Sequence, residues 1–178
     1  MEKVASKYAS ALFELALEKK EDTVLLQEVK QVQSILEAHP DFIALLNKTQ
    51  LDKREKKSLL LEVFKKNHPY LQNSLLLLID RNRALLIPHF LQAYRHHYNM
   101  HHKIIEGIAY TVTPLPKEDL KALEKELSDL EHQTVELTNR LDPRLIKGIK
   151  IRFGDKILDA SMKTRLENLR NTLKEGRS

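Results

Sequence analysis

Apolar residues recur at helical spacing along the first twenty positions of the chain and form two adjacent stripes. The segment from Lys3 to Lys20 contains neither proline nor glycine, so nothing in it interrupts a helix. The first stripe consists of Val4, Tyr8, Ala11 and Leu15, and the second of Ala5, Ala9, Leu12 and Ala16. Together the stripes span roughly 200° of the helix, against roughly 100° for an ordinary surface helix. Two interpretations stay open: a central helix covered on both sides by its own bundle, or a helix that docks a partner helix on one stripe.

The helical periodicity continues to residue 104 and predicts five more helices joined by short turns. Their expected starts are Asp22, Asp41, Leu51, Pro69 and Leu86, and we expect the carboxylate of Asp22 to cap its helix. The fifth of the six helices is apolar nearly all round, through Leu71, Leu75, Leu76, Leu77, Leu78 and Ile79. Such a helix is either buried or bound to a partner. The pattern predicts a mainly α protein whose residues 1–104 form an N-terminal six-helix bundle.

From Lys103 onward the pattern changes from helical to alternating, which predicts a second domain over residues 105–178. Strands are expected near 105–112, 134–138 and 149–153, with a turn at Gly154 and Asp155 and a return strand at Ile157 and Leu158. Helices are expected over 117–131 and after Ser161, the last one with an apolar face of Met162, Leu166, Leu169 and Leu173. The second domain is therefore predicted to be a small α+β unit.

Composition excludes several kinds of chemistry from this chain of 178 residues. It contains no cysteine and only four glycines, none in a glycine-rich run, so disulfides, thiolate chemistry and a glycine-rich phosphate loop are excluded. No apolar run approaches the ~20 residues that span a bilayer, and the N-terminus lacks the pattern of a secretory signal. We expect no cofactor, no direct membrane insertion and residence in the cytoplasm.

The net charge of +5 raises the alternative of a basic, helical nucleic-acid-binding protein. Basic residues exceed acidic ones by four in residues 1–104 and by one in residues 105–178, so the excess is diffuse. The densest basic group is expected to be a solvated helix face rather than a phosphate site, and it comprises Lys53, Arg54, Lys56, Lys57, Lys65 and Lys66. Nucleic-acid binding would show steep salt dependence, whereas docking through an apolar surface would not.

Four histidines lie close together at the predicted end of the sixth helix: His96, His97, His101 and His102. His97 and His101 stand one helical turn apart and could share a zinc ion, but the sequence offers no third ligand and no glutamate at the position that a zinc protease requires. A hydrated helix end is the simpler interpretation. No activated nucleophile or paired-carboxylate motif supports an enzyme.

Two stretches near the ends of the chain resemble one protein family. Residues 8–16, YASALFELA, resemble the opening helix of the ATP synthase delta subunit, the relative of mitochondrial OSCP. Residues 148–161, GIKIRFGDKILDAS, followed by Arg165, Leu166 and Leu169, resemble the signature of that family near the carboxyl terminus. The chain departs from the family pattern at Lys147 and Ala160, where glycine is common. The resemblance covers nearly the whole chain.

The resemblance implies a non-catalytic stator protein of the F1Fo ATP synthase, present in one copy per complex at the cytoplasmic face of the cell membrane. It would link the alpha and beta head to the peripheral stalk during proton-driven ATP synthesis. The N-terminal domain would hold the N-terminal helix of an alpha subunit in a groove between the first and fifth helices, and the predicted groove residues are Val4, Tyr8, Ala11, Leu15, Leu75, Leu78 and Ile79. The C-terminal domain would contact the C-terminus of the b subunit, and the candidates are Val135, Ile149, Ile151, Leu166 and Leu169. For each of these residues the alternative is a place in the core of its own domain, and for the fifth-helix leucines and the stalk-binding candidates that alternative explains the pattern at least as well.

Overall fold

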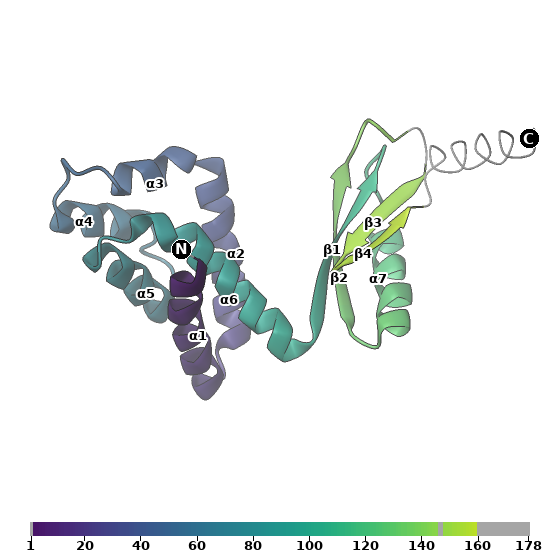
Figure 1. The fold of residues 1–178 in the computed structure, drawn as a ribbon, viewed down its shortest axis with the longest axis horizontal. Helices are drawn as coiled ribbons and strands as arrows, with labels where there is room; N and C mark the ends of the chain where they lie inside the picture. The colour runs from purple at the N-terminus through teal and green to yellow at the C-terminus, as the bar shows by residue number, and fades with distance from the viewer. Residues whose placement is uncertain (1, 146–147, 160–178) are drawn as a thin grey trace, which may run out of the picture. The chain divides into compact units, whose positions relative to one another are not determined.

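The computed structural model describes residues 2–145 and 148–159 of the chain. It divides into two compact units, residues 1–101 and residues 102–178 (Figure 1). The N-terminal unit is helical, and the C-terminal unit contains a four-stranded sheet. The prediction of a mainly helical chain with a small α+β part at its C-terminal end is confirmed.

The N-terminal unit is built from helices connected by short turns. Their bounds are α1 (Glu2–Lys19), α2 (Asp22–Ala38), α3 (Pro40–Leu46), α4 (Lys53–Val63), α5 (Pro69–Asp80), the 3-10 turn η1 (Ala84–Leu86) and α6 (Ile87–His102). Large apolar side chains from most of these helices meet in one core, where Leu25, Leu60, Leu71, Phe90 and Tyr94 have no exposed surface. The core therefore depends on the whole unit rather than on one pair of helices.

Local sequence signals account for several of the helix ends. Asp52 accepts the backbone N–H of Glu55 at 2.8 Å, and the Glu55 carboxylate returns to the Asp52 N–H at 2.8 Å, which forms a capping box at the start of α4. His68 caps α5, and Pro69 occupies the first helical position. The prediction that Asp22 caps α2 is wrong. Lys20 takes a positive φ of 58° and turns the chain so that Glu21 becomes the N-cap and Asp22 the first helical residue.

Two members of the basic group on α4 contact the end of α5. Lys53 Nζ donates to the backbone carbonyl of Asp80 at 3.0 Å, and Lys57 Nζ lies 2.5 Å from its carboxylate. Cations are favourable at a helix C-terminus, where carbonyl groups lack helical partners. The expectation that the whole basic group only faces water is therefore incomplete, because these two lysines stabilise the α4 and α5 pair.

The C-terminal unit is a single sheet with one described helix on one face. Its elements are β1 (Ile104–Thr111), α7 (Lys117–Glu131), β2 (Thr134–Leu141), β3 (Ile149–Phe153) and β4 (Lys156–Asp159), and the strand order is β2-β1-β3-β4. β1 and β2 are parallel with Ile104 opposite Thr134, as a β-α-β crossover through α7 requires, and the other pairs are antiparallel. The predicted last helix, after Ser161, lies outside the described residues.

The core of the C-terminal unit lies between α7 and the sheet. Its buried residues are Ala109, Leu127, Val135, Leu137, Ile151 and Phe153. At the centre of β1, Gly107 lets the neighbouring strands approach closely, since a Cβ atom there would lie 2.7 Å from the Cβ of Phe153 and 2.8 Å from Leu137 Cδ2. The positive φ of 51° at Gly154 turns β3 into β4.

Candidate docking surfaces

The two apolar stripes of α1 have different environments in the folded unit. Ala5, Ala9 and Ala16 have no exposed surface and Leu12 has only 3%, so the second stripe lies entirely in the core. The first stripe stays at the surface: Val4 is 36% exposed, Ala11 is also exposed, and Tyr8 and Leu15 are half-buried. We name Val4, Tyr8, Ala11 and Leu15 the α1 stripe. This helix therefore keeps an apolar surface that the rest of the N-terminal unit leaves accessible.

The three groove residues predicted on α5 lie in the core instead. Leu75 and Leu78 have no exposed surface and Ile79 has 2%. The physical reason is that α5 packs against α1, α4 and η1, so most of its circumference is covered. Within the predicted apolar run, Leu77 is exposed, with 41% of its surface accessible, and Leu76 is half-buried. The structure thus brings the four predicted α1 residues to the surface and does not bring these three α5 residues there.

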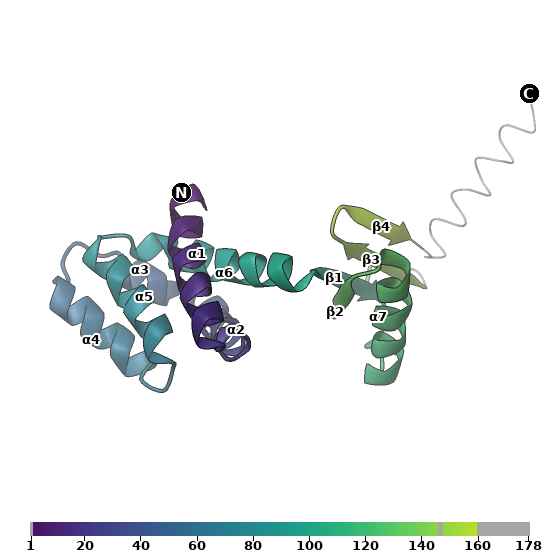
Figure 2. The ribbon, with the colours of Figure 1, turned by 90° about the horizontal axis from the view of Figure 1, so that it is seen from below.

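The turn between α5 and η1 contributes an arginine, Arg83, that sequence reasoning did not select. Arg83 Nη1 donates to the Tyr8 hydroxyl at 2.9 Å, and the Arg83 guanidinium carbon lies 5.8 Å from the centre of the Tyr8 ring. Asn82 adopts a positive φ of 54°, and the Arg83 N–H donates to the Leu78 carbonyl at 2.7 Å. Figure 1 and Figure 2 both show α5 alongside α1. Arg83 therefore places a cation beside the α1 stripe.

On its other side, α1 packs against the histidine-rich end of α6 through Phe13. The Phe13 ring lies 6.4 Å from the His97 ring at an interplanar angle of 17°, and 5.6 Å from the His101 ring. Ser6 Oγ and His97 Nε2 are 3.2 Å apart. In residues 2–145 and 148–159, no three His, Cys, Asp or Glu side chains converge as a metal site would require. Two of the four clustered histidines instead contact α1, which differs from the hydrated helix end expected from the sequence.

The predicted stalk-binding residues divide into three groups. Val135 and Ile151 are 2% and 5% exposed and belong to the core under α7, so they do not offer a surface. Ile149 is half-buried and lines a cavity. Leu166 and Leu169 lie outside the described residues.

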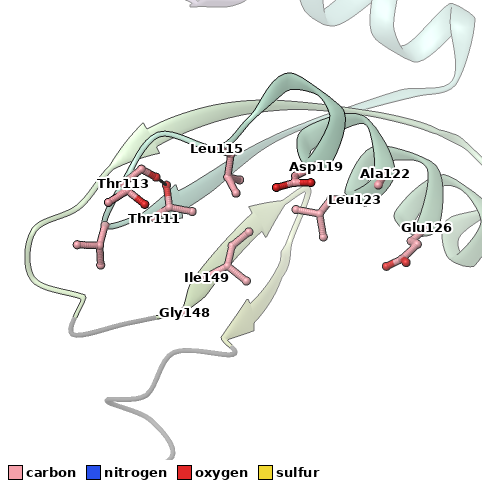
Figure 3. A pocket seen from close by; sticks show the side chains of 10 residues that line it. Thr111, Thr113, Leu115, Asp119, Ala122, Leu123, Glu126, Gly148 and Ile149 are labelled. Carbon is pink, nitrogen blue, oxygen red and sulfur yellow. Dashed lines mark hydrogen bonds between the residues drawn. The ribbon is translucent and has the colours of Figure 1, made fainter.

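The cavity beside Ile149 has a volume of about 690 Å³ and opens between β3, α7 and the segment that follows β1 (Figure 3). Leu115, Leu123 and Ile149 supply apolar surface, and Asp119 and Glu126 on α7 supply carboxylates. Asn139 holds one wall in place, since its Oδ1 accepts the Leu115 N–H at 3.0 Å and its Nδ2 donates to Thr111 Oγ1 at 2.8 Å. Such a lining suits an apolar segment that also carries basic side chains.

None of the helices in the described part of the chain is long and apolar enough to cross a membrane.

Comparisons with known proteins agree over almost the whole chain. The profile of the family described as ATP synthase delta (OSCP) subunit matches residues 4–173. ATP synthase subunit delta of Geobacillus sp. (strain WCH70) is 33% identical over 171 residues, which are 96% of this chain and 96% of that protein. ATP synthase subunit delta of Clostridioides difficile (strain 630) is 30% identical over 174 residues, 97% of this chain and 96% of that one.

A solved structure has the same fold. In the cryo-EM structure of the Toxoplasma gondii mitochondrial ATP synthase hexamer, one chain aligns with a TM-score of 0.69 over 95% of this chain and 96% of its own length, at 20% sequence identity. The family profile and the bacterial relatives together cover both units described above. The chain belongs to the ATP synthase delta (OSCP) subunit family.

Proposed function

We propose that the α1 stripe docks the N-terminal helix of an ATP synthase alpha subunit and that the C-terminal unit contacts the C-terminus of the stalk's b subunit. As a member of the delta (OSCP) family, the chain is a non-catalytic stator subunit of ATP synthase. It connects the catalytic head to the peripheral stalk, so its task is to hold two partners rather than to carry out a reaction.

The accessible α1 stripe is the observation that carries this proposal. Helix-in-groove binding requires an apolar stripe that the core has not already covered. One apolar stripe of α1 is buried in the core, and the other, the α1 stripe, stays at the surface. Ala11 lies in the middle of the accessible stripe, and a side chain this small permits close approach of a partner backbone. Most of the binding energy would come from burial of apolar surface, which depends little on salt.

We propose that residues 1–104 act as one six-helix bundle toward the catalytic head and residues 105–178 toward the stalk. The continuous core of the helical unit supports the first part, since a single packed body transmits force without internal rearrangement. One copy would serve each complex, held at the cytoplasmic face of the cell membrane through its partners.

For the stalk, the cavity beside Ile149 is the part of the C-terminal unit that supports a docking role. Its apolar walls and its two acidic side chains, Asp119 and Glu126, fit an amphipathic segment with basic residues. Leu166 and Leu169 remain candidates for the same contact from outside the described residues.

The structure weakens the argument for a nucleic-acid-binding protein, because part of the basic group on α4 contacts the protein itself. Lys53 and Lys57, two of the basic residues that suggested it, contact the C-terminal end of α5. No described feature favours that alternative over the α1 stripe.

The test is calorimetric titration of the purified full chain with a synthetic peptide copying the N-terminal segment of the alpha subunit from the same organism. Wild type should bind one peptide with little dependence on salt. Ala11→Asp should abolish binding while circular dichroism remains that of the folded chain, and Ala44→Asp, at an exposed alanine on α3, should bind like wild type. A folded wild type that fails to bind the peptide would contradict the proposal.

A further inference from the structure

We infer that Arg83 is a specificity-determining residue of the α1 stripe and that it pairs with a carboxylate on the docked helix. This inference rests on the proposed function, because it assigns chemistry to the helix that the α1 stripe receives. The fold places Arg83 beside Tyr8, 75 residues away in sequence.

The backbone of Arg83 is fixed by the turn that ends α5. Asn82 in the left-handed region reverses the chain, its N–H donates to the Ile79 carbonyl at 2.9 Å, and the Arg83 N–H donates to the Leu78 carbonyl at 2.7 Å. Ile79 and Leu78 are core residues with at most 2% of their surface exposed. The Arg83 backbone is thus anchored to buried residues of the core.

The side chain of Arg83 is held by Tyr8 in two ways. Its Nη1 donates to the Tyr8 hydroxyl at 2.9 Å, and its guanidinium lies 5.8 Å from the ring centre, within the range of a cation–π contact. Both contacts reduce the rotamer freedom that an exposed arginine would lose on binding. A guanidinium that is already held in position gains more binding free energy from a new acceptor than a mobile guanidinium does, because it loses less conformational freedom.

The bond to Tyr8 uses one of the five N–H donors that the guanidinium carries. A planar fork of this kind matches the two oxygens of a carboxylate. Lys3 and Lys7 lie at the solvent-exposed edge of the same half of α1, so this half of the stripe carries positive charge on both sides. A helix with an aspartate or glutamate above Tyr8 therefore fits this half of the stripe better than a neutral or basic helix.

The experiment is a double-mutant cycle by calorimetry with the full chain and the alpha-subunit N-terminal peptide. Arg83→Gln is titrated with the wild-type peptide and with peptides in which each aspartate or glutamate in turn is replaced by its amide. The matched control is Arg81→Gln, which removes an identical charge from an exposed position two residues away.

We expect Arg83→Gln to weaken binding about tenfold and Arg81→Gln to leave it within about twofold. Replacing one particular peptide carboxylate by its amide should lower the affinity of the peptide about tenfold for wild type but not for Arg83→Gln. This coupling is the signature of a direct pair. Arg83→Lys should restore only part of the affinity, because an ammonium group lacks the fork.

Two results would overturn the inference while leaving the proposed function intact: peptide binding that is unchanged in Arg83→Gln, or equal losses in Arg83→Gln and Arg81→Gln. Loss of affinity in Arg83→Gln without coupling to any peptide carboxylate would also overturn it. Failure of the wild-type chain to bind the peptide at all would instead contradict the proposed function, so the two failures are distinguishable.

Discussion

The carboxylate of Glu124 on α7 accepts the backbone N–H of Leu137 on β2 at 2.8 Å. One turn further along α7, Ser128 Oγ accepts the N–H of Val135 at 2.8 Å. β2 is an edge strand, and alternate N–H groups of an edge strand have no partner strand. The helix therefore supplies side-chain acceptors where the sheet ends.

Removing these acceptors should destabilise the C-terminal unit. Glu124→Ala removes the carboxylate that accepts the Leu137 N–H, at a place where the side chains of Leu137 and Val135 are buried. We therefore expect the free energy of unfolding to fall by about 1 to 2 kcal/mol. Urea denaturation measures the change. Glu118→Ala, at an exposed position in the first turn of the same helix, should change stability by less than about 0.5 kcal/mol. Equal effects of the two variants would contradict the role of Glu124.

Even a methyl side chain at Gly107 should destabilise the C-terminal unit. A Cβ atom at this position lies 2.9 Å from the Arg152 carbonyl as well as close to Phe153 and Leu137, so Gly107→Ala must push strands apart. We expect a loss of about 2 to 3 kcal/mol by overpacking. Gly154→Ala is the matched control, because its Cβ meets nothing closer than 3.6 Å and only the positive φ of 51° opposes it, at about 1 kcal/mol. Unfolding by urea should rank the two variants in that order, and the reverse order would refute the steric account.

Phe13 should be the main contact between α1 and α6. Its ring meets Tyr94 edge-on at 5.8 Å, in addition to the rings of His97 and His101, and only 7% of Phe13 is exposed. Phe13→Ala should cost about 3 kcal/mol, through lost burial and the cavity it leaves. Denaturation followed by the helical circular dichroism signal measures the loss. Val24→Ala, at a position 54% exposed on α2, should leave the midpoint nearly unchanged.

Stability should fall in alkaline solution because of Tyr94. Burial raises the pKa of Tyr94 above its ordinary value of 10.0, and Asp22 and Tyr98 add to the effect. The folded chain keeps the proton at a pH where the unfolded chain releases it. The contribution of the Tyr94 proton to the free energy of unfolding is therefore complete below about pH 10 and is lost as the pH rises above that value.

The measurement is the free energy of unfolding between about pH 9 and about pH 11.5 for wild type and Tyr94→Phe. The variant should show a shallower decline than wild type. Leu91→Val, a core variant without a titratable group, should lower the whole curve and keep the wild-type slope. A Tyr94→Phe slope identical to that of wild type would exclude this tyrosine as the cause.

Periodicity divided the apolar residues of α1 into two stripes separated from a polar face, but it left open whether the core covers both stripes. It could not assign the residues of α5, where the run from Leu75 to Ile79 is apolar in every direction. In such a run the neighbours decide exposure, and they left Leu77 at the surface and buried Leu78. A periodic pattern carries no information about which of several apolar faces a neighbouring helix will cover.

Contacts between distant residues were beyond the reach of sequence patterns. Nothing in the polar break after α5 indicated that Arg83 would meet Tyr8, although Asn82 is a residue type that favours the left-handed turn seen there. The strands after Lys103 were easier to predict, because alternation of apolar and polar residues over 149–153 leaves only one face to bury. Predictions from the sequence were correct where the residue pattern allows only one face of an element to be buried. They failed where tertiary packing decides which of several apolar faces is buried.

The most direct test of docking on the α1 stripe uses the absence of cysteine from the sequence. Single variants Ala11→Cys and Ala44→Cys each carry one thiol at an exposed position of the N-terminal unit. Their alkylation rates are measured in the free chain and after addition of delta-depleted F1 from the same organism. We expect F1 to slow alkylation at position 11 by at least about tenfold and to leave the rate at position 44 unchanged, because a helix docked on the α1 stripe covers position 11. Equal rates at position 11 with and without bound F1 would contradict docking on the α1 stripe.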